Sequence, residues 1–214
     1  MIQLSKTSKL DGIMSWSLQA LETCPGSKEK GQLVPACAGC YATTNFYLMD
    51  SVIIPREINR TDWERSGWVA DMVQALDNSR YFRWLDSGDL YNVKLAEKVY
   101  KVMKATPWVN HWLPTRMHKF SKFKKVFDKM QTLPNVSVRF SSDSVTGHYV
   151  KGLHGSVIIP TPADLPRGAK LCQAYANGGK CSGCRACYDK KVKLIAYPAH
   201  GHKMAKVIKI EVSK

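Results

Sequence analysis

The sequence predicts an α/β fold built on a parallel sheet, in which about six strands form part of a (β/α) barrel. Short apolar runs typical of strands alternate with segments whose apolar residues recur at helical spacing. Such alternation is typical of parallel strands joined by helical crossovers. The 214 residues, 44% of them hydrophobic, fit a single domain over residues 1–214 with fewer than eight strands.

The individual elements follow from these patterns. Strands are expected in the apolar runs 13–18, 81–85, 109–113, 136–140, 156–159, 192–197 and 207–212. Helices are expected over residues 61–78, 92–105 and 121–133. Thr61 and Glu64 have the spacing of a capping box for the first of these helices. Residues 41–50 can begin another helix, which Pro55 would end.

Polar clusters follow three of the expected strands. They are Asp86-Ser87-Gly88-Asp89, residues 115–119, and Ser141-Ser142-Asp143-Ser144. In parallel α/β folds, ligands bind at the carboxyl ends of the strands. The first cysteine-rich loop also follows an expected strand, so we expect one edge of the sheet to carry that loop and all three clusters.

Seven cysteines lie in two short regions. The loop 24–41 contains Cys24, Cys37 and Cys40, spaced C-x12-C-x2-C, and the C-terminal segment 166–214 contains Cys172, Cys181, Cys184 and Cys187, spaced C-x8-C-x2-C-x2-C. A Cys-x-x-Cys turn brings two sulfurs close enough to bind one metal or cluster. The odd number of cysteines and the two-residue gaps make metal ligands a better interpretation than disulfides.

The identity of the metal remains open at this point. The loop cysteines favour iron–sulfur chemistry, with a zinc site or three unrelated thiols as alternatives. The four C-terminal cysteines would close a coordination sphere, so either zinc or [4Fe–4S] fits a structural or electron-relaying centre there. In a third arrangement, both regions supply ligands to a single centre.

The charge of the chain narrows the class of partner. A net charge of +15 favours a polyanion such as nucleic acid or a nucleotide, although a basic protein without such a partner is an equal alternative. The sequence has no run of about 18 apolar residues and begins without the pattern of a secretion signal. We therefore expect no membrane partner and a cytoplasmic location, where thiols stay reduced.

Several segments together resemble a known protein family. SWSLQALETC and ACAGCY, at residues 15–24 and 36–41, resemble the cluster-binding loop of radical S-adenosylmethionine proteins. With the tail NGGKCSGCRACYDKKVKLIAYPAH, at residues 177–200, the chain looks more closely like phage-encoded, radical-SAM-like proteins of poorly known function. Ser87-Gly88-Asp89 stands where that family usually has Gly-Gly-Glu. The resemblance implies a radical-SAM-like partial barrel, located in the host cytoplasm.

The resemblance also implies a cofactor and roles for individual residues. Cys24, Cys37 and Cys40 would hold a [4Fe–4S] cluster with one open iron, to which S-adenosylmethionine would bind. Asp89 and the backbone of Ser87 and Gly88 would hold its ammonium group. Its carboxylate would be held by Arg116 or Ser141, and Asp143 at the second of these strand ends is a further candidate for cofactor binding.

One departure from the family bears on function. The first gap in the loop has twelve residues where the family usually has three, and the aromatic Tyr41 follows the last cysteine instead of preceding it. The sequence is therefore consistent with three alternative functions. They are a radical enzyme acting on nucleic acid or a nucleotide, a non-catalytic iron–sulfur or zinc module that binds nucleic acid or a host protein, and a barrel that keeps its cluster without S-adenosylmethionine.

Overall fold

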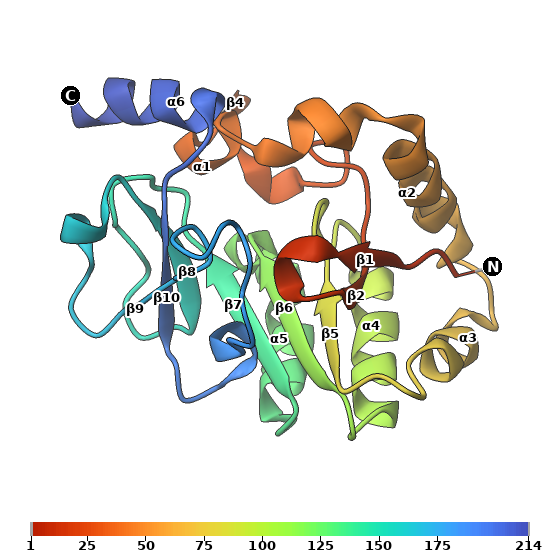
Figure 1. The fold of residues 1–214 in the computed structure, drawn as a ribbon. Coiled ribbons are helices and arrows are strands. Elements are labelled where there is room, and N and C mark those ends of the chain that lie inside the picture. The colour runs from red at the N-terminus through yellow and green to blue at the C-terminus, as the bar shows by residue number, and fades with distance from the viewer. Residues whose placement is uncertain (1, 214) are drawn as a thin grey trace.

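The computed structural model describes residues 2–213, and a mostly parallel sheet lies at its centre (Figure 1). Within these residues, eight strands pair in the order β1-β2-β5-β6-β7-β8-β10-β9. Only β1 is antiparallel to its neighbour. The strands of this sheet are β1 (Ser5–Thr7), β2 (Ile13–Trp16), β5 (Tyr81–Trp84), β6 (Asn110–Thr115), β7 (Val136–Ser141), β8 (Gly155–Ile159), β9 (Lys170–Leu171) and β10 (Leu194–Pro198). A separate hairpin, β3 (Lys28–Glu29) and β4 (Gln32–Leu33), lies inside the first cysteine loop.

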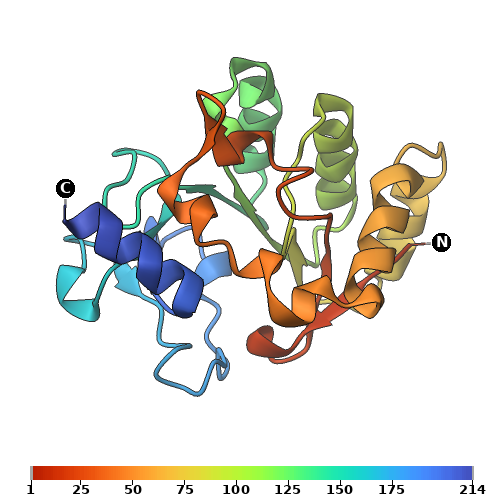
Figure 2. The same cartoon turned by 90° about the horizontal axis from the view of Figure 1, so that it is seen from above.

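Helices cover one face of this sheet and the edge at which its parallel strands end. They are α1 (Pro35–Ala38), α2 (Asp50–Asp62), α3 (Trp68–Ala75), α4 (Val93–Ala105), α5 (Lys124–Thr132) and α6 (His202–Val212). Helices α4 and α5 pack against one face, whereas α1 and α6 lie over the carboxyl ends of the strands (Figures 1 and 2). The face of the sheet opposite α4 and α5 is therefore not covered by these helices.

The main hydrophobic core lies between the sheet and helices α3, α4 and α5. It includes the indoles of Trp16, Trp68 and Trp84, which are fully buried and meet one another at ring-centroid distances of 5.5 to 6.5 Å. The buried residues of α4 recur at helical spacing and face this core: Leu95, Ala96, Val99, Val102 and Met103. The Asn92 side chain caps the first turn of α4 by accepting the Lys94 N–H. The burial of this face explains the strong periodicity in the sequence.

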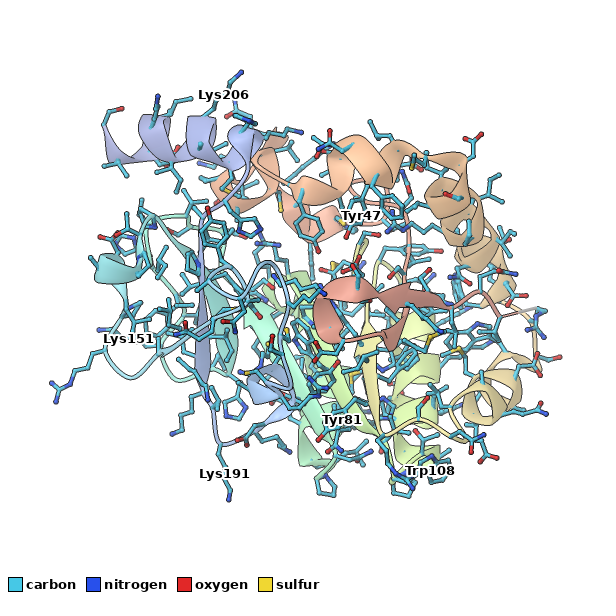
Figure 3. All side chains as sticks on the ribbon, viewed as in Figure 1. Tyr47, Tyr81, Trp108, Lys151, Lys191 and Lys206 are labelled. Carbon is cyan, nitrogen blue, oxygen red and sulfur yellow. The ribbon has the colours of Figure 1, made fainter. Side chains whose placement is uncertain are left out.

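The opposite face of the sheet carries the C-terminal cysteine segment. A short 3-10 turn, η8 (Ala186–Tyr188), lies against β6 and β7. Tyr188 packs edge-on against Tyr81 and Trp112, whose ring centroids lie 5.1 and 5.7 Å away. Tyr81 is at the amino end of β5, far from Tyr47 above the carboxyl ends (Figure 3). The segment thus covers the lower part of this face.

The predicted fold class is confirmed in its coarser part. The first six expected strands correspond to β2, β5, β6, β7, β8 and β10, all of them parallel, and the helices expected at 92–105 and 121–133 are present. Among the described residues, β1 and β9 each pair on one side only, so the sheet is open. Closure into a barrel is not seen.

Two helices differ from the prediction near residue 61. The expected helix 61–78 is instead the end of α2 and the whole of α3, and no capping box forms because the Thr61 hydroxyl donates to Ile58 O. Pro55 lies inside α2 instead of ending it. The buried Asn59 amide donates to Gln3 O and Ser17 O at 2.9 and 3.1 Å. Tertiary contacts of this kind outweigh the one helical hydrogen bond that proline removes.

The strand predicted at 207–212 is wrong, because these residues belong to α6. The alternation of lysine or glutamate with apolar residues suggested a strand. However, Met204, Val207 and Ile208 also have helical spacing, and they pack together with Ala36 and Val145. A short apolar pattern fits both periods, and the partner surface decides between them.

Candidate functional site

The carboxyl ends of the parallel strands open into a cavity of about 470 Å³. Its walls come from the ends of β5, β6, β7, β8 and β10, from the first cysteine loop, and from the C-terminal cysteine segment. Six of the seven cysteines line it: Cys24, Cys37, Cys40, Cys172, Cys181 and Cys187. The structure therefore brings the two cysteine regions, which are far apart in the sequence, to one space.

The first cysteine loop packs closely against the ends of β6 and β7 and against α6. A Cβ added to Gly26 would lie 2.8 Å from the Arg116 carbonyl oxygen, and one added to Gly39 would lie 2.8 Å from the Met204 sulfur. The Ala36 N–H donates to Asp143 O at 2.9 Å. These contacts leave no room for larger residues, so the loop has a defined position over the sheet.

The thiols of this loop lie in a poorly solvated environment. Burial raises the pKa of Cys24 to about 12, and the negative charge of Asp89 acts in the same direction. Burial also raises the pKa of Cys37, against the effect of the Arg116 guanidinium. Both side chains are neutral thiols at pH 7 in this environment, so binding of a metal to their thiolates would release protons.

Ser87, Gly88 and Asp89 line the cavity and also hold the first loop in place. The Ser87 hydroxyl donates to Leu18 O at 2.7 Å. Gly88 has a φ of +76°, and a Cβ there would meet Leu18 and Thr23 at 2.6 Å. Glycine is needed at this position for its backbone conformation and for the close approach of the preceding loop.

Asp89 is buried, and both of its carboxylate oxygens accept hydrogen bonds. Oδ1 accepts from the Thr115 hydroxyl at 2.6 Å and from the Leu90 N–H at 2.8 Å, and Oδ2 accepts from the Arg116 N–H at 2.8 Å. Burial raises the pKa of this carboxyl, although its hydrogen bonds oppose the shift. Asp89 thus links the ends of β5 and β6, and the expected contact with an ammonium group stays a prediction.

The remaining candidates lie at the ends of β6 and β7. Arg116 and Ser141 line the cavity, and the Arg116 guanidinium donates to Ser142 O at 2.9 Å. Asp143 is set back from the cavity lining and forms ion pairs with Arg116 and Lys119 at 3.3 and 2.6 Å. Asp143 therefore orients Arg116, while a direct role in ligand binding stays a prediction.

The C-terminal cysteine segment is held by one buried arginine. The Arg139 side chain is fully buried and donates to the carbonyls of Ala186, Cys187, Asp189 and Val192 at 2.8 to 2.9 Å. Burial lowers the pKa of this guanidinium, which remains charged at neutral pH. Four carbonyls around one cation fix the backbone on both sides of Cys187.

The four C-terminal cysteines do not share one environment. Cys172, Cys181 and Cys187 line the cavity, and the Cys187 sulfur lies 3.2 Å from the Tyr197 hydroxyl. Cys184 is exposed and is absent from the cavity lining. The expected four-thiolate site therefore separates into three inward thiols and one outward thiol. Within residues 2–213, no three His, Cys, Asp or Glu side chains already stand in an arrangement that could hold a metal ion.

Sequence reasoning missed two arginines of the site. Arg83 lines the cavity, pairs with Asp86 at 2.7 Å, and lies 4.5 Å from the centre of the Trp112 ring. Arg139 holds the C-terminal segment as described above. Both are buried charged residues within a strand, and a charged residue inside an apolar run was the signal that could have identified them.

Three tyrosines also belong to the site, and the sequence marked only Tyr41, as the aromatic residue after Cys40. Tyr41 and Tyr47 line the cavity and donate to the Asp86 backbone oxygen and carboxylate at 2.6 and 2.7 Å. Tyr197 lines it beside Cys187. Nothing in the local sequence marks Tyr47 and Tyr197, because their positions depend on the tertiary arrangement.

No helix among the described residues has the length and apolar character needed to cross a membrane.

Comparison with known proteins gives the family of the chain. No curated protein and no solved structure matches the sequence. The sequence model of one family, described as Gene product 88, matches residues 2–207. This family is of a phage type and has no known function, so the match confirms the phage-type part of the expected resemblance. The chain belongs to the Gene product 88 family.

Proposed function

We propose that this is an iron–sulfur protein in which Cys24, Cys37 and Cys40 hold a [4Fe–4S] cluster with one iron open to the cavity. The observation that carries this proposal is the position of three thiols of one loop in a cavity at the carboxyl ends of parallel strands. Three cysteine ligands leave one iron of such a cluster without a protein ligand. A cluster with three cysteine ligands is also what the resemblance to radical-SAM-like proteins implies.

The donor set suits iron and sulfide. All three side chains are thiols, which as thiolates are soft ligands that favour Fe–S clusters and zinc over hard cations. Close packing at Gly26 and Gly39 holds the loop that carries them. When bound, the cluster would supply one-electron chemistry. The chain itself would position the ligand and limit its exposure to water.

We further propose that S-adenosylmethionine binds in the cavity and that the substrate is a nucleotide or nucleic acid. The cavity volume of about 470 Å³ lies within the range of roughly 300–1,000 Å³ typical of small-molecule sites. Arg116 and Ser141 supply donors for a carboxylate, and the buried Asp89 is the nearby anion for an ammonium group. The net charge of +15 supports a polyanionic substrate.

The experiment is a turnover assay on protein purified and reconstituted without oxygen. Reduced, iron-loaded protein is incubated with S-adenosylmethionine, and adenosyl products are separated by chromatography. The proposal predicts product from the wild type and from the Cys184→Ser variant, whose cysteine is exposed, and at least about tenfold less from Cys37→Ser. Iron-loaded wild type that neither binds nor cleaves S-adenosylmethionine would refute this part.

A zinc-containing protein without iron or sulfide would refute the cluster as well. The remaining interpretation would then be a zinc-stabilised module whose basic surface binds nucleic acid. Such binding is recognised by a linear fall of log affinity with log salt concentration.

A further inference from the structure

We propose that Cys172, Cys181 and Cys187 form a second metal–thiolate centre facing the same cavity, and that Cys184 is not one of its ligands. This centre is separate from the cluster proposed at the first loop and does not depend on it. Its cofactor class is a zinc ion or an iron–sulfur cluster, since thiolates favour both.

The first argument is the position of the three cysteines around one cavity. Cys172, Cys181 and Cys187 all line the cavity, although they come from different parts of the segment. Cys172 follows β9, and its N–H donates to Ala196 O of β10 at 2.8 Å. Cys181 donates its N–H to Lys9 O at 2.8 Å. Backbone hydrogen bonds to two separate parts of the molecule therefore fix the positions of two of the ligands.

The surroundings of Cys187 resemble those of a metal ligand. Its backbone carbonyl accepts from Arg139 Nε at 2.8 Å, and its sulfur lies 3.2 Å from the Tyr197 hydroxyl. Hydrogen bonds from the residues around a metal site orient its ligands and tune their basicity. Tyr197 and Arg139 are in a position to do this for Cys187.

The outward position of Cys184 is built into its turn. The N–H groups of Ser182 and Gly183 donate to the Asp11 carboxylate at 3.2 and 3.0 Å, and the Arg185 guanidinium donates to it at 2.9 Å. Asp11 therefore binds the residues on both sides of Cys184. The side chain of Cys184 remains exposed in this turn, on a backbone that is held in place.

A three-thiolate centre keeps a coordination position free, whereas a four-thiolate centre is closed. Because the three thiols face the cavity, the free position would accept a nitrogen, oxygen or sulfur atom of the molecule bound there. As placed, the thiols do not yet surround one ion, so binding would involve rotation of these side chains on the fixed backbone. The second centre would then bind the cavity ligand as well as stabilise the fold.

The test is alkylation of the wild-type chain, read by mass spectrometry at each cysteine. Iodoacetamide is applied to zinc-loaded or iron-loaded protein without oxygen, and to the same protein after removal of metal with a chelator. We expect metal to slow alkylation of Cys172, Cys181 and Cys187 at least about tenfold and to leave Cys184 unchanged. Protection of Cys184 together with the others, or no protection at any of the four, would overturn the proposal.

Variants give a second readout with Co²⁺ as the probe. Cys181→Ser should lower the sulfur-to-cobalt charge-transfer absorption and weaken Co²⁺ binding at least about tenfold, while the matched variant Cys184→Ser should match the wild type. Equal losses in the two variants would show a four-thiolate centre and contradict the proposal. Because alkylation reports each cysteine separately, failure of the first cluster would appear at Cys24, Cys37 and Cys40 alone.

Discussion

The two faces of the sheet differ in what they contact. One packs against the helices, and the other lines the cavity and binds the C-terminal cysteine segment. On β5, Phe82 and Trp84 are buried under the helices, while Arg83 between them lines the cavity. On β7, Val138 packs in the helical core and Arg139 binds the C-terminal cysteine segment. Successive side chains of a strand point to opposite faces, so one face provides stability and the other is free to hold chemistry. Mutations on the helical face should therefore lower stability without changing metal binding.

The largest loss of stability is expected on the helical face. Phe82 is fully buried, with its ring centroid 5.0 Å from that of Trp84. Phe82→Ala should lower the free energy of unfolding by about 3–5 kcal/mol because it leaves a cavity. Urea unfolding measures this, with the exposed Leu153→Ala as the control at below about 0.5 kcal/mol. The metal content of the folded fraction should not change. A loss of metal would contradict the claim that the helical face contributes to stability and not to metal binding.

A buried arginine should matter for both stability and metal on the cavity face. Arg139→Met removes the donors of four hydrogen bonds and leaves carbonyls of the C-terminal segment unpaired. We expect a loss of about 3 kcal/mol in the free energy of unfolding. We also expect loss of the metal protection of Cys187. The exposed Arg167→Met is the matched control. A variant with normal stability and normal protection would show that Arg139 does not hold this segment.

A smaller effect is expected where the first loop meets the strand ends. Gly88 and Gly152 have φ values of +76° and +82°, but only Gly88 has neighbours within 4 Å of an added Cβ. Both alanine variants carry the backbone strain, so the difference between them measures the close packing alone. Gly88→Ala should be less stable than Gly152→Ala by about 2 kcal/mol. Equal unfolding midpoints in urea would mean that the loop tolerates displacement.

The smallest effect is a pH dependence of the helical core. His111 is buried, its Nδ1 accepts from the Trp84 indole at 3.2 Å, and its Nε2 lies 2.9 Å from the Thr106 hydroxyl. The Thr106 hydroxyl already donates to Val102 O, so Nε2 carries the proton and the ring is neutral. Burial lowers the pKa of His111 to about 3. The unfolded chain therefore binds the proton first as pH falls.

The contribution of His111 to the free energy of unfolding is fully present above its pKa in the unfolded chain, about 6.5. It is lost progressively as the pH falls from there toward about 3, its pKa in the folded protein. At pH 5.5 the loss should be about 1.4 kcal/mol relative to pH 7.5. Urea unfolding at both pH values measures it, and the difference between wild type and His111→Gln isolates this residue from other histidines. The same pH dependence in both proteins would show that His111 is not the group responsible.

Much of the fold follows from local sequence patterns, and the site follows from them only in part. The strands were predictable because runs such as residues 81–85 and 136–140 are apolar and short. Their shared polar edge was predictable because parallel strands end on the same side. By contrast, α6 was misread because its apolar spacing fits a helix and a strand, and its packing against Ala36 decided the outcome.

The division among the C-terminal cysteines could not be predicted. The spacing C-x2-C-x2-C treats Cys181, Cys184 and Cys187 alike, whereas the structure turns one outward and two inward. This division depends on Asp11, which lies 171 residues before Ser182 in the chain. It also depends on Arg139, whose contacts are formed only in the folded state. Long-range contacts of this kind leave no local signal.

The central claim is that the thiols of the first loop hold an iron–sulfur cluster on the cavity face. The most direct test is to count iron, sulfide and zinc in protein purified without oxygen, for the wild type and for the Cys24→Ser, Cys37→Ser and Cys40→Ser variants. We predict that each of the three variants contains about four irons and four sulfides fewer than the wild type. Wild-type protein that contains zinc without sulfide, or variants that keep the full iron content, would contradict the claim.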